Sequence, residues 1–351
     1  MKKKLLALCI LSIGCLSAQE DTVKVAANLT PDQMAEQDYN SGLAALKRND
    51  NNGAIELFTK SLTNKPSFDK ALANRAIAYT NLKKHPEALK DINDAIKINP
   101  QNPETYFNKG LIFLQMNLKD SEHVALDNCL KLNGNHSEAA YYKGMLHYEA
   151  SEFDKAIEYY TKAITSNPKY AYAYNDRASA KRAKLDYSGA IADYEKAISL
   201  DNALVFVNNN LGSVYRLNKQ HDKAIEAYTK ALQTNPSYLT ALVNRGATHF
   251  ENNNLKAAQA DFEDVLKKDP NNSAAYNNLA SIAIKNKDYK KAKDMAARSI
   301  QLDNKNGPAY YNRGIARQML HEEEGCCEDW KKALELGVQG AKSFINASCD
   351  N

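Results

Sequence analysis

The sequence predicts an all-helical solenoid built from stacked helical hairpins. A ladder of small and aromatic residues recurs with a constant step, starting at Gly144, Ala178, Gly212 and Gly246 in four successive copies. In the first copy the small residue Gly144 is followed by Ala156, Tyr160 and Ala163, and the later copies keep these separations, with Phe or Val at some positions. A fixed period of this length is typical of a repeat array.

Each part of the ladder has a physical reason in a pair of antiparallel helices. The small residue would lie midway along the first helix, where the second helix must approach closely. The alanine–aromatic–alanine set, at spacings of four and three, would share one face of the second helix. A proline or asparagine near the end stops that helix. One hairpin cannot bury its apolar face alone, so each repeat needs a neighbour.

This ladder resembles that of the tetratricopeptide repeat family. Over residues 35–340 the resemblance implies nine hairpins in a right-handed superhelix of about one turn. The nine repeats are expected at 35–68, 69–102, 103–136, 137–170, 171–204, 205–238, 239–272, 273–306 and 307–340. The segment 341–351 is expected to form a helix and tail that cap the last apolar face.

The third repeat departs from the pattern. Glu122 and Cys129 stand where alanines are expected, and Gly134 replaces the proline. A glutamate at a packing position should loosen or tilt that hairpin, although simple decay of the repeat also explains it.

Residues 1–18 have the pattern of a secretory signal peptide: Lys2–Lys4, a short apolar run, then small residues. Cleavage after Ala18 would give an exported soluble protein, periplasmic or secreted. Cleavage before Cys15 would resemble lipoprotein processing and anchor the chain to a membrane, although Ser12 stands where that pattern usually has leucine. Residues 19–34 are expected to be a flexible linker that ends in a Thr30-Pro31 helix start.

Composition and motifs exclude several functions. The net charge of +4 falls to +1 without Lys2–Lys4, which argues against bulk binding of nucleic acid or anionic membranes. The sequence has no phosphate-binding loop, no nucleophile elbow and no paired Cys-x-x-Cys motif. Its seven histidines are scattered. We therefore expect no enzymatic activity, no cofactor and no metal site.

Three cysteines lie near the C-terminus. Cys326 replaces the alanine that packs within the last hairpin, and Cys327 is about 100° further around the helix. The run from Cys327 to Trp330, with a closing cysteine, resembles the ends of other exported tetratricopeptide proteins. The resemblance implies a disulfide between Cys327 and Cys349, with Cys326–Cys349 as the rival pair, and an oxidising compartment.

A column of asparagines is the main candidate for function. Asparagine stands two positions before the small residue in seven of the nine repeats, whereas Tyr142 and Asp176 interrupt the column. Helix propensity does not explain this choice. The resemblance places the column on the concave groove, where an amide can pair with both the N–H and the C=O of an extended peptide. We call the following residues the asparagine row: Asn40, Asn74, Asn108, Asn210, Asn244, Asn278 and Asn312.

The row also has a structural interpretation, because asparagine there could bond a neighbouring repeat or be hydrated. Aromatic residues predict further groove surface, unless they are interior: Tyr39, Phe107, Tyr141, Tyr172 and Phe206. The lysine column that captures a peptide's C-terminal carboxylate in chaperone-binding relatives is absent, so that activity is not expected.

The sequence thus predicts an exported scaffold whose groove holds an extended protein segment. The alternatives are a membrane-anchored lipoprotein accessory to envelope assembly or secretion, a non-catalytic regulator of an enzyme partner, and a binder of a sugar polymer.

Overall fold

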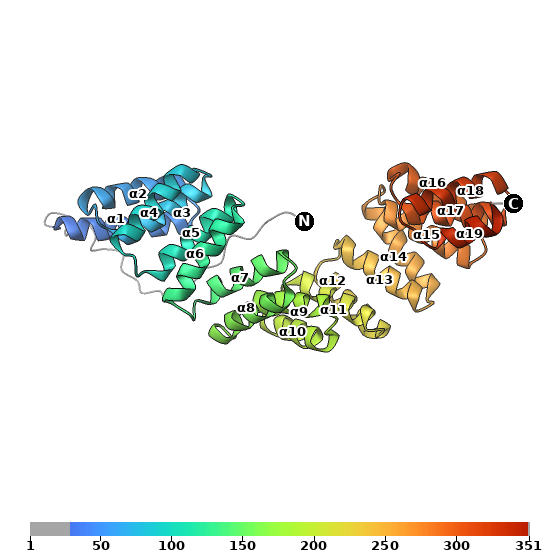
Figure 1. Cartoon of the computed structure of the whole chain (residues 1–351), viewed down its shortest axis with the longest axis horizontal. Helices are drawn as coiled ribbons and strands as arrows, with labels where there is room; N and C mark the ends of the chain where they lie inside the picture. Colours follow the sequence, from blue (N-terminus) through green and yellow to red (C-terminus); the bar gives the residue numbers. More distant parts are fainter. Residues whose placement is uncertain (1–28, 350–351) are drawn as a thin grey trace. The chain divides into compact units, whose positions relative to one another are not determined.

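The computed structural model describes residues 29–349, apart from the side chain of Glu324, and this part of the chain is helical without strands (Figure 1). The predicted signal peptide, the lipidation candidate Cys15 and most of the predicted linker lie outside the described residues. Within the described part, eighteen helices form nine hairpins and one helix follows them, which confirms the expected fold class. The chain divides into two compact units, residues 1–134 and 135–351.

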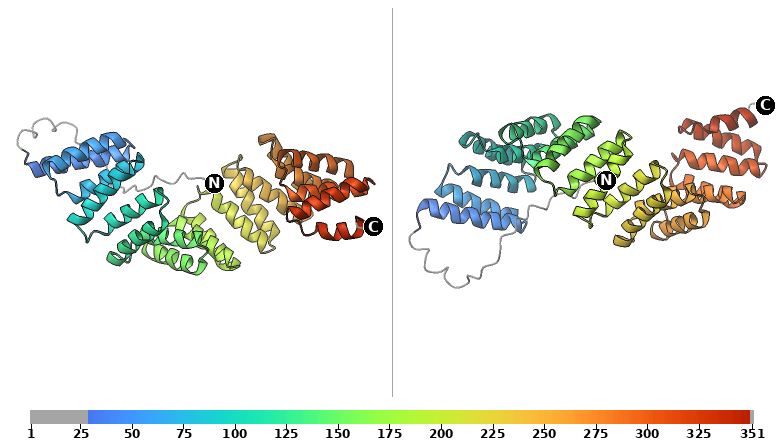
Figure 2. Two further views of the ribbon diagram at one scale, coloured as in Figure 1. Left: turned by 45° about the horizontal axis from the view of Figure 1, so that its top comes forward. Right: turned by 90° about the horizontal axis from the view of Figure 1, so that it is seen from below.

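In the first compact unit the hairpins are α1/α2, α3/α4 and α5/α6; in the second they run from α7/α8 to α17/α18, and α19 packs on α18 (Figures 1 and 2). Within each compact unit, the second helix of a hairpin also contacts the first helix of the next hairpin. The helices are α1 Pro31–Lys47, α2 Asn51–Asn64, α3 Asp69–Asn81, α4 His85–Ile98, α5 Pro103–Gln115, α6 Lys119–Leu132, α7 Ser137–Glu149, α8 Phe153–Ser166, α9 Ala171–Ala183, α10 Tyr187–Leu200, α11 Val205–Leu217, α12 His221–Thr234, α13 Leu239–Glu251, α14 Leu255–Lys268, α15 Ser273–Lys285, α16 Tyr289–Leu302, α17 Gly307–Met319, α18 Glu323–Glu335 and α19 Ala341–Ser348.

The first helix starts where its capping signal predicts. Thr30 is the N-cap and exchanges hydrogen bonds with Gln33, and Pro31 occupies the first turn. The last four residues of the predicted linker are therefore helical.

The ladder residues pack as close neighbours inside each hairpin. A Cβ built on Gly144 would lie 2.6 Å from ring carbons of Tyr160, which is fully buried in the second helix of the same hairpin. Gly314 and Trp330 have the same relation, since a Cβ on Gly314 would collide with the indole nitrogen. The small residue is thus required by the aromatic side chain that it faces.

The third hairpin is not loosened, contrary to expectation. Glu122 is buried, with 3% of its surface exposed, and α5 packs on α6 as the first helix does in the other hairpins. Cys129 is a buried free thiol at a packing position. The boundary between the two compact units nevertheless falls after Gly134, at the end of this repeat.

Pairs of a partly buried arginine and a buried aspartate join the helices of four hairpins, a feature that the sequence analysis did not identify. In each pair an arginine of the first helix bonds an aspartate of the second helix at the same sequence separation. Three of the arginines also donate to a threonine of the preceding repeat, so that they link three helices. The pairs are Arg75–Asp91, Arg177–Asp193, Arg245–Asp261 and Arg313–Asp329.

The last helix covers the end of the array. Ala341 and Ile345 are buried, and the ring of Phe344 lies 4.9 Å from that of Trp330. The predicted capping helix is thus present and buries apolar surface of the last hairpin.

Candidate peptide-binding face

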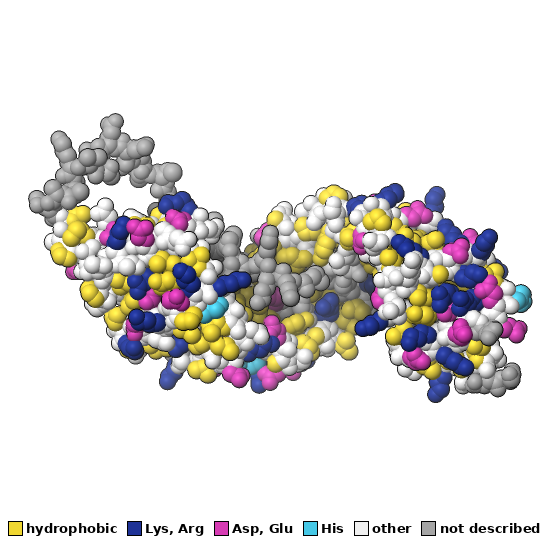
Figure 3. Space-filling model, turned by 90° about the horizontal axis from the view of Figure 1, so that it is seen from above, with side chains coloured by type: hydrophobic (Ala, Val, Ile, Leu, Met, Phe, Trp, Pro, Cys, Tyr) yellow, Lys and Arg dark blue, Asp and Glu magenta, His cyan; other side chains and the backbone are white. Residues whose placement is uncertain are grey.

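The asparagine row lies on the first helices of its hairpins, as the sequence predicts. Consecutive first helices are in contact within each compact unit, so the row follows a surface made by those helices. We call this surface the first-helix face. Acidic and basic side chains are interspersed on the side of the molecule that Figure 3 shows, without a field of one sign.

Four row residues bond sideways to the preceding repeat. Each side-chain amide donates to a side-chain oxygen of the residue just before the row position of the previous repeat. The bonds are Asn74 to Tyr39 (3.3 Å), Asn210 to Asn175 (3.2 Å), Asn244 to Asn209 (3.0 Å) and Asn312 to Asn277 (2.8 Å). These hydrogen bonds join neighbouring first helices, and they run mainly between side chains.

The other three row residues make no such bond within the described part of the chain. Asn108 and Asn278 follow repeats that place Ala73 and Val243 at the acceptor position, and neither side chain can accept a hydrogen bond. Asn40 belongs to the first repeat and is exposed. Asn278 is half-buried, and the preceding repeat makes no hydrogen bond to its side-chain amide.

Where Asp176 interrupts the row, its carboxylate makes the hydrogen bond to the preceding repeat. It accepts hydrogen bonds from the Tyr141 hydroxyl (2.7 Å) and from the Asn175 amide (2.8 Å). Because Asn210 donates to Asn175, one hydrogen-bonded chain joins α7, α9 and α11. Burial raises the pKa of Asp176 above its usual range, against the opposing effect of these two hydrogen bonds.

In Asn210 and Asn244 the bond to the preceding repeat leaves much of the side-chain amide available. A side-chain amide has two N–H donors and an oxygen with two lone pairs, and the bond to the previous repeat uses one donor. In these two residues a second donor and the oxygen remain, which is the pair of groups needed to meet the C=O and the N–H of an extended backbone. The amides of Asn74 and Asn312 each donate to a further acceptor, the Lys70 carbonyl and the Ser281 hydroxyl. The bond also fixes the rotamer of the amide, which lowers the entropic cost of binding.

The predicted aromatic surface is partly wrong. Phe107 and Tyr141 are buried, with 8% and 4% of their surfaces exposed. Tyr141 packs on Tyr160 and Tyr170, and Tyr39 packs in the same way on Phe58 and Phe68. Residues at this place in the repeat face their own hairpin because the second helix and the following loop offer aromatic partners.

Two of the predicted aromatic residues do remain at the surface. Tyr172 and Phe206 occupy the second position of α9 and α11 and are half-buried, with ring centroids 6.2 Å apart in a stacked arrangement. Thr240, at the same position of α13, is exposed and lies one turn before Asn244.

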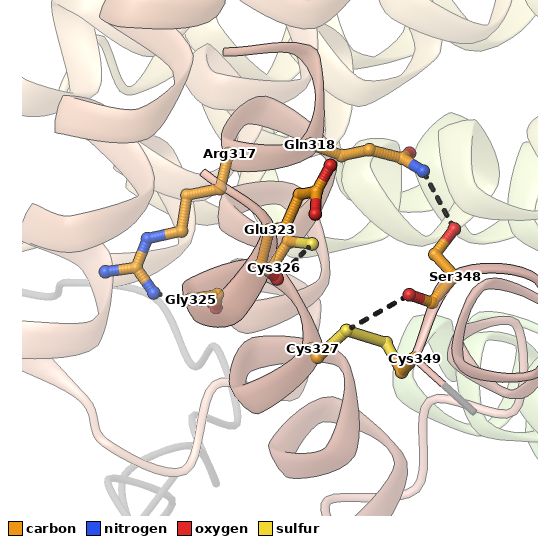
Figure 4. The surroundings of a disulfide bond; sticks show 8 residues. All are labelled: Arg317, Gln318, Glu323, Gly325, Cys326, Cys327, Ser348 and Cys349. Atoms are coloured by element: carbon orange, nitrogen blue, oxygen red, sulfur yellow. Dashed lines mark hydrogen bonds between the residues drawn. A yellow bond between two sulfur atoms is a disulfide. The ribbon is translucent and has the colours of Figure 1, made fainter. Parts of the chain in front are cut away.

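At the C-terminal end the structure joins Cys327 of α18 to Cys349, which follows α19 (Figure 4). The Cα atoms of the pair are 5.6 Å apart, and Gln318 donates a hydrogen bond to Ser348 beside them. Cys326 is a free, buried thiol that bonds the Glu323 carbonyl, and burial raises its pKa. The rival pairing of Cys326 with Cys349 is not the one present.

Two further observations bear on the kind of site. Among residues 29–349, no three His, Cys, Asp or Glu side chains are grouped closely enough to hold a metal ion. Within the same residues, every helix is too short or too polar to cross a bilayer.

The chain matches three family models that are each described as tetratricopeptide repeat. One matches residues 69–102, 137–170 and 206–238, another 171–204 and a third 249–312, which together make up more than half of the chain. Heat shock protein STI1 of Saccharomyces cerevisiae is 39% identical over 88 residues, which are 25% of this chain and 14% of that protein.

Solved structures are similar in fold. A tetratricopeptide repeat protein from Parabacteroides merdae has a TM-score of 0.58 at 16% identity, covering 71% of this chain and 99% of that one. The C-terminal part of a repeat-containing protein from Cytophaga hutchinsonii has a TM-score of 0.57 at 19% identity, covering 68% and 98%. PilF of Pseudomonas aeruginosa has a TM-score of 0.55 at 16% identity, covering 60% and 96%.

Proposed function

Because the chain belongs to the tetratricopeptide repeat family, we propose that it is a non-catalytic scaffold whose first-helix face holds an extended segment of a partner protein. The fold supports a protein–protein interaction scaffold, since proteins of this family bind protein or peptide partners. The observation that carries the finer proposal is the asparagine row. The amides of Asn210 and Asn244 are held in place by bonds to the preceding repeat that use one donor each, while a second donor and the oxygen remain.

In this mode of binding the protein recognises the backbone of the bound peptide rather than its side chains. Each amide would meet one peptide group of an extended chain, so affinity would depend little on the identity of the peptide residues. The concave groove that the family resemblance implies would place the row along the path of the bound segment.

Asn278 and Asn312 separate binding from stability. Asn278 makes no bond to the preceding repeat, whereas the Asn312 amide donates to Asn277 and to Ser281 (2.9 Å). We expect Asn278→Ala to weaken peptide binding about tenfold without changing the melting temperature, since loss of one hydrogen bond costs about 1–1.5 kcal/mol. We expect Asn312→Ala to lower the melting temperature because it breaks contacts between repeats.

The measurement uses an array of unrelated extended peptides probed with the purified chain. Under the proposal, Asn278→Ala reduces binding to peptides of different sequence by a similar factor. Unchanged binding of all peptides by Asn278→Ala would contradict the proposal that the row holds the peptide backbone.

We further propose that the protein is exported. The N-terminal pattern and the cysteine pair both support an oxidising compartment, and a disulfide that joins residues 22 apart should stabilise the last hairpin by about 3 kcal/mol. A membrane-anchored form would instead carry lipid on Cys15, and that alternative stays open.

The cysteines of the natively exported chain test this. We expect a non-reducing digest to give one peptide pair, Cys327 with Cys349, and a mature chain that begins at Gln19. Iodoacetamide should leave Cys129 and Cys326 unmodified under native conditions, because both thiols are buried. Alkylation of Cys327 and Cys349 in the unreduced chain would contradict export to an oxidising compartment.

A further inference from the structure

A pocket opens on the first-helix face where Asp176 interrupts the asparagine row. Its volume is about 270 Å³, many times the ~10–15 Å³ that admits one water molecule. Residues of α7, α8 and α9, all in the second compact unit, line it: Met145, Tyr148, Glu149, Tyr160, Asp176 and Ser179. The lining contains two carboxylates and no lysine or arginine.

Asp176 differs from the buried aspartates of the array. Asp91, Asp193, Asp261 and Asp329 each have an arginine within ion-pair distance. Asp176 has only the Tyr141 hydroxyl and the Asn175 amide within the described residues, and neither is charged. A carboxylate withdrawn from water gains most from a cationic partner.

The Tyr160 hydroxyl is the second polar group that distinguishes this pocket. The corresponding tyrosines of the next two repeats bond a serine of their own hairpin: Tyr194 bonds Ser179 at 2.8 Å and Tyr228 bonds Ser213 at 3.2 Å. Met145 stands at that place for Tyr160, so within the described chain this hydroxyl has no hydrogen-bond partner and belongs to the pocket lining.

We infer that this pocket receives the side chain of a lysine or arginine from the extended segment. Asp176 and the Tyr160 hydroxyl would accept hydrogen bonds from the ammonium or guanidinium group, and Met145 and the Tyr148 ring would pack on its apolar stem. The inference rests on the proposed function, because the chain Asp176–Asn175–Asn210 connects the pocket to the asparagine row. The row grips the backbone, and the pocket fixes the register by selecting one basic residue.

Asp176→Asn is the decisive variant. The amide oxygen still accepts one of the two hydrogen bonds, and the Tyr141 hydroxyl can rotate to accept from the new NH₂ group. The variant removes a charge that burial disfavours, so we expect its melting temperature to equal or exceed that of the native chain. Glu158→Gln is the matched control, because Glu158 is an exposed carboxylate of α8 outside the pocket lining.

The first experiment tests the pocket without a peptide. The full chain carries ¹³C-methyl methionine, with the Met145 signal assigned through Met145→Leu, and is titrated with n-butylammonium or, as the neutral control, n-butanol. The inference predicts that n-butylammonium shifts the Met145 signal, that n-butanol does not, and that Asp176→Asn abolishes the shift whereas Glu158→Gln keeps it. Equal shifts with both probes, or no shift with n-butylammonium, would overturn it.

The second experiment separates the pocket from the scaffold function. Peptides that bind the full chain are compared with versions in which a single lysine is replaced by norleucine. We expect about tenfold or weaker binding of the norleucine peptide by the native chain and by Glu158→Gln, but no difference with Asp176→Asn. Equal binding of both peptides by the native chain overturns the pocket assignment, and if n-butylammonium still binds, the pocket serves a free amine. Failure of every peptide to bind overturns the scaffold proposal itself.

Discussion

Replacing Asp193 by alanine is expected to lower the free energy of unfolding by about 3 kcal/mol, the lower end of the range for a buried pair, because it leaves two partly buried cations without this partner. Asp193 is 7% exposed in its side chain and bonds both Arg177 (2.7 Å) and Lys181 (2.7 Å). Arg177 also donates to Thr161 of the preceding repeat, so the loss should loosen two repeats. Urea denaturation measures the size of the effect, and amide hydrogen exchange should locate it in α8–α10.

The exposed pair Lys162–Glu158 supplies the control for this prediction. Its two side chains are 49% and 59% exposed, and loss of such a pair changes stability by about 0–1 kcal/mol. A similar small effect for Asp193→Ala would show that the arginine–aspartate pairs do not hold the hairpins together.

Trp330→Ala should have an effect of similar size on the last hairpin. Trp330 is fully buried against Gly314 and Phe344, and truncation of such a side chain costs about 3–5 kcal/mol. We expect α17–α19 to lose protection from hydrogen exchange while the preceding hairpins keep theirs, because each repeat contacts only its neighbours.

Trp330→Phe distinguishes packing from polar contributions. The indole N–H has no hydrogen-bond partner in the described structure, so phenylalanine loses volume but no hydrogen bond. We expect its cost to be well below that of alanine. If all hairpins of Trp330→Ala lost protection from hydrogen exchange equally, the expectation that only the last hairpin is destabilised would be wrong.

The sequence predicted the architecture well because the packing of each hairpin is encoded locally. Gly144 and Tyr160 keep a separation that recurs with the period, so their contact is visible as a spacing. The arginine–aspartate pairs were missed although each arginine directly precedes the small residue of its repeat, as Arg245 precedes Gly246, and has its aspartate at a constant separation. That spacing is the signal that could have identified them.

The candidate site was less accessible from sequence. The row was visible, but its sideways bonds depend on which residue the previous repeat supplies: Asn209 accepts a bond from Asn244, whereas Val243 cannot accept one from Asn278. The pocket at Asp176 needs three helices to be placed together, and no single spacing encodes that. Phe107 and Tyr141 were assigned to the surface because periodicity identifies a helix face but not the loop aromatics that cover it.

We propose that the first-helix face, and not the second helices, holds the partner segment. A photo-reactive benzoylphenylalanine at Thr240, one turn before Asn244 on α13, should cross-link a bound extended peptide, and unlabelled peptide should compete. The same group at the exposed Glu263 of α14 should give no cross-link. Cross-linking from Glu263 with none from Thr240 would place the partner on the second helices and contradict the account.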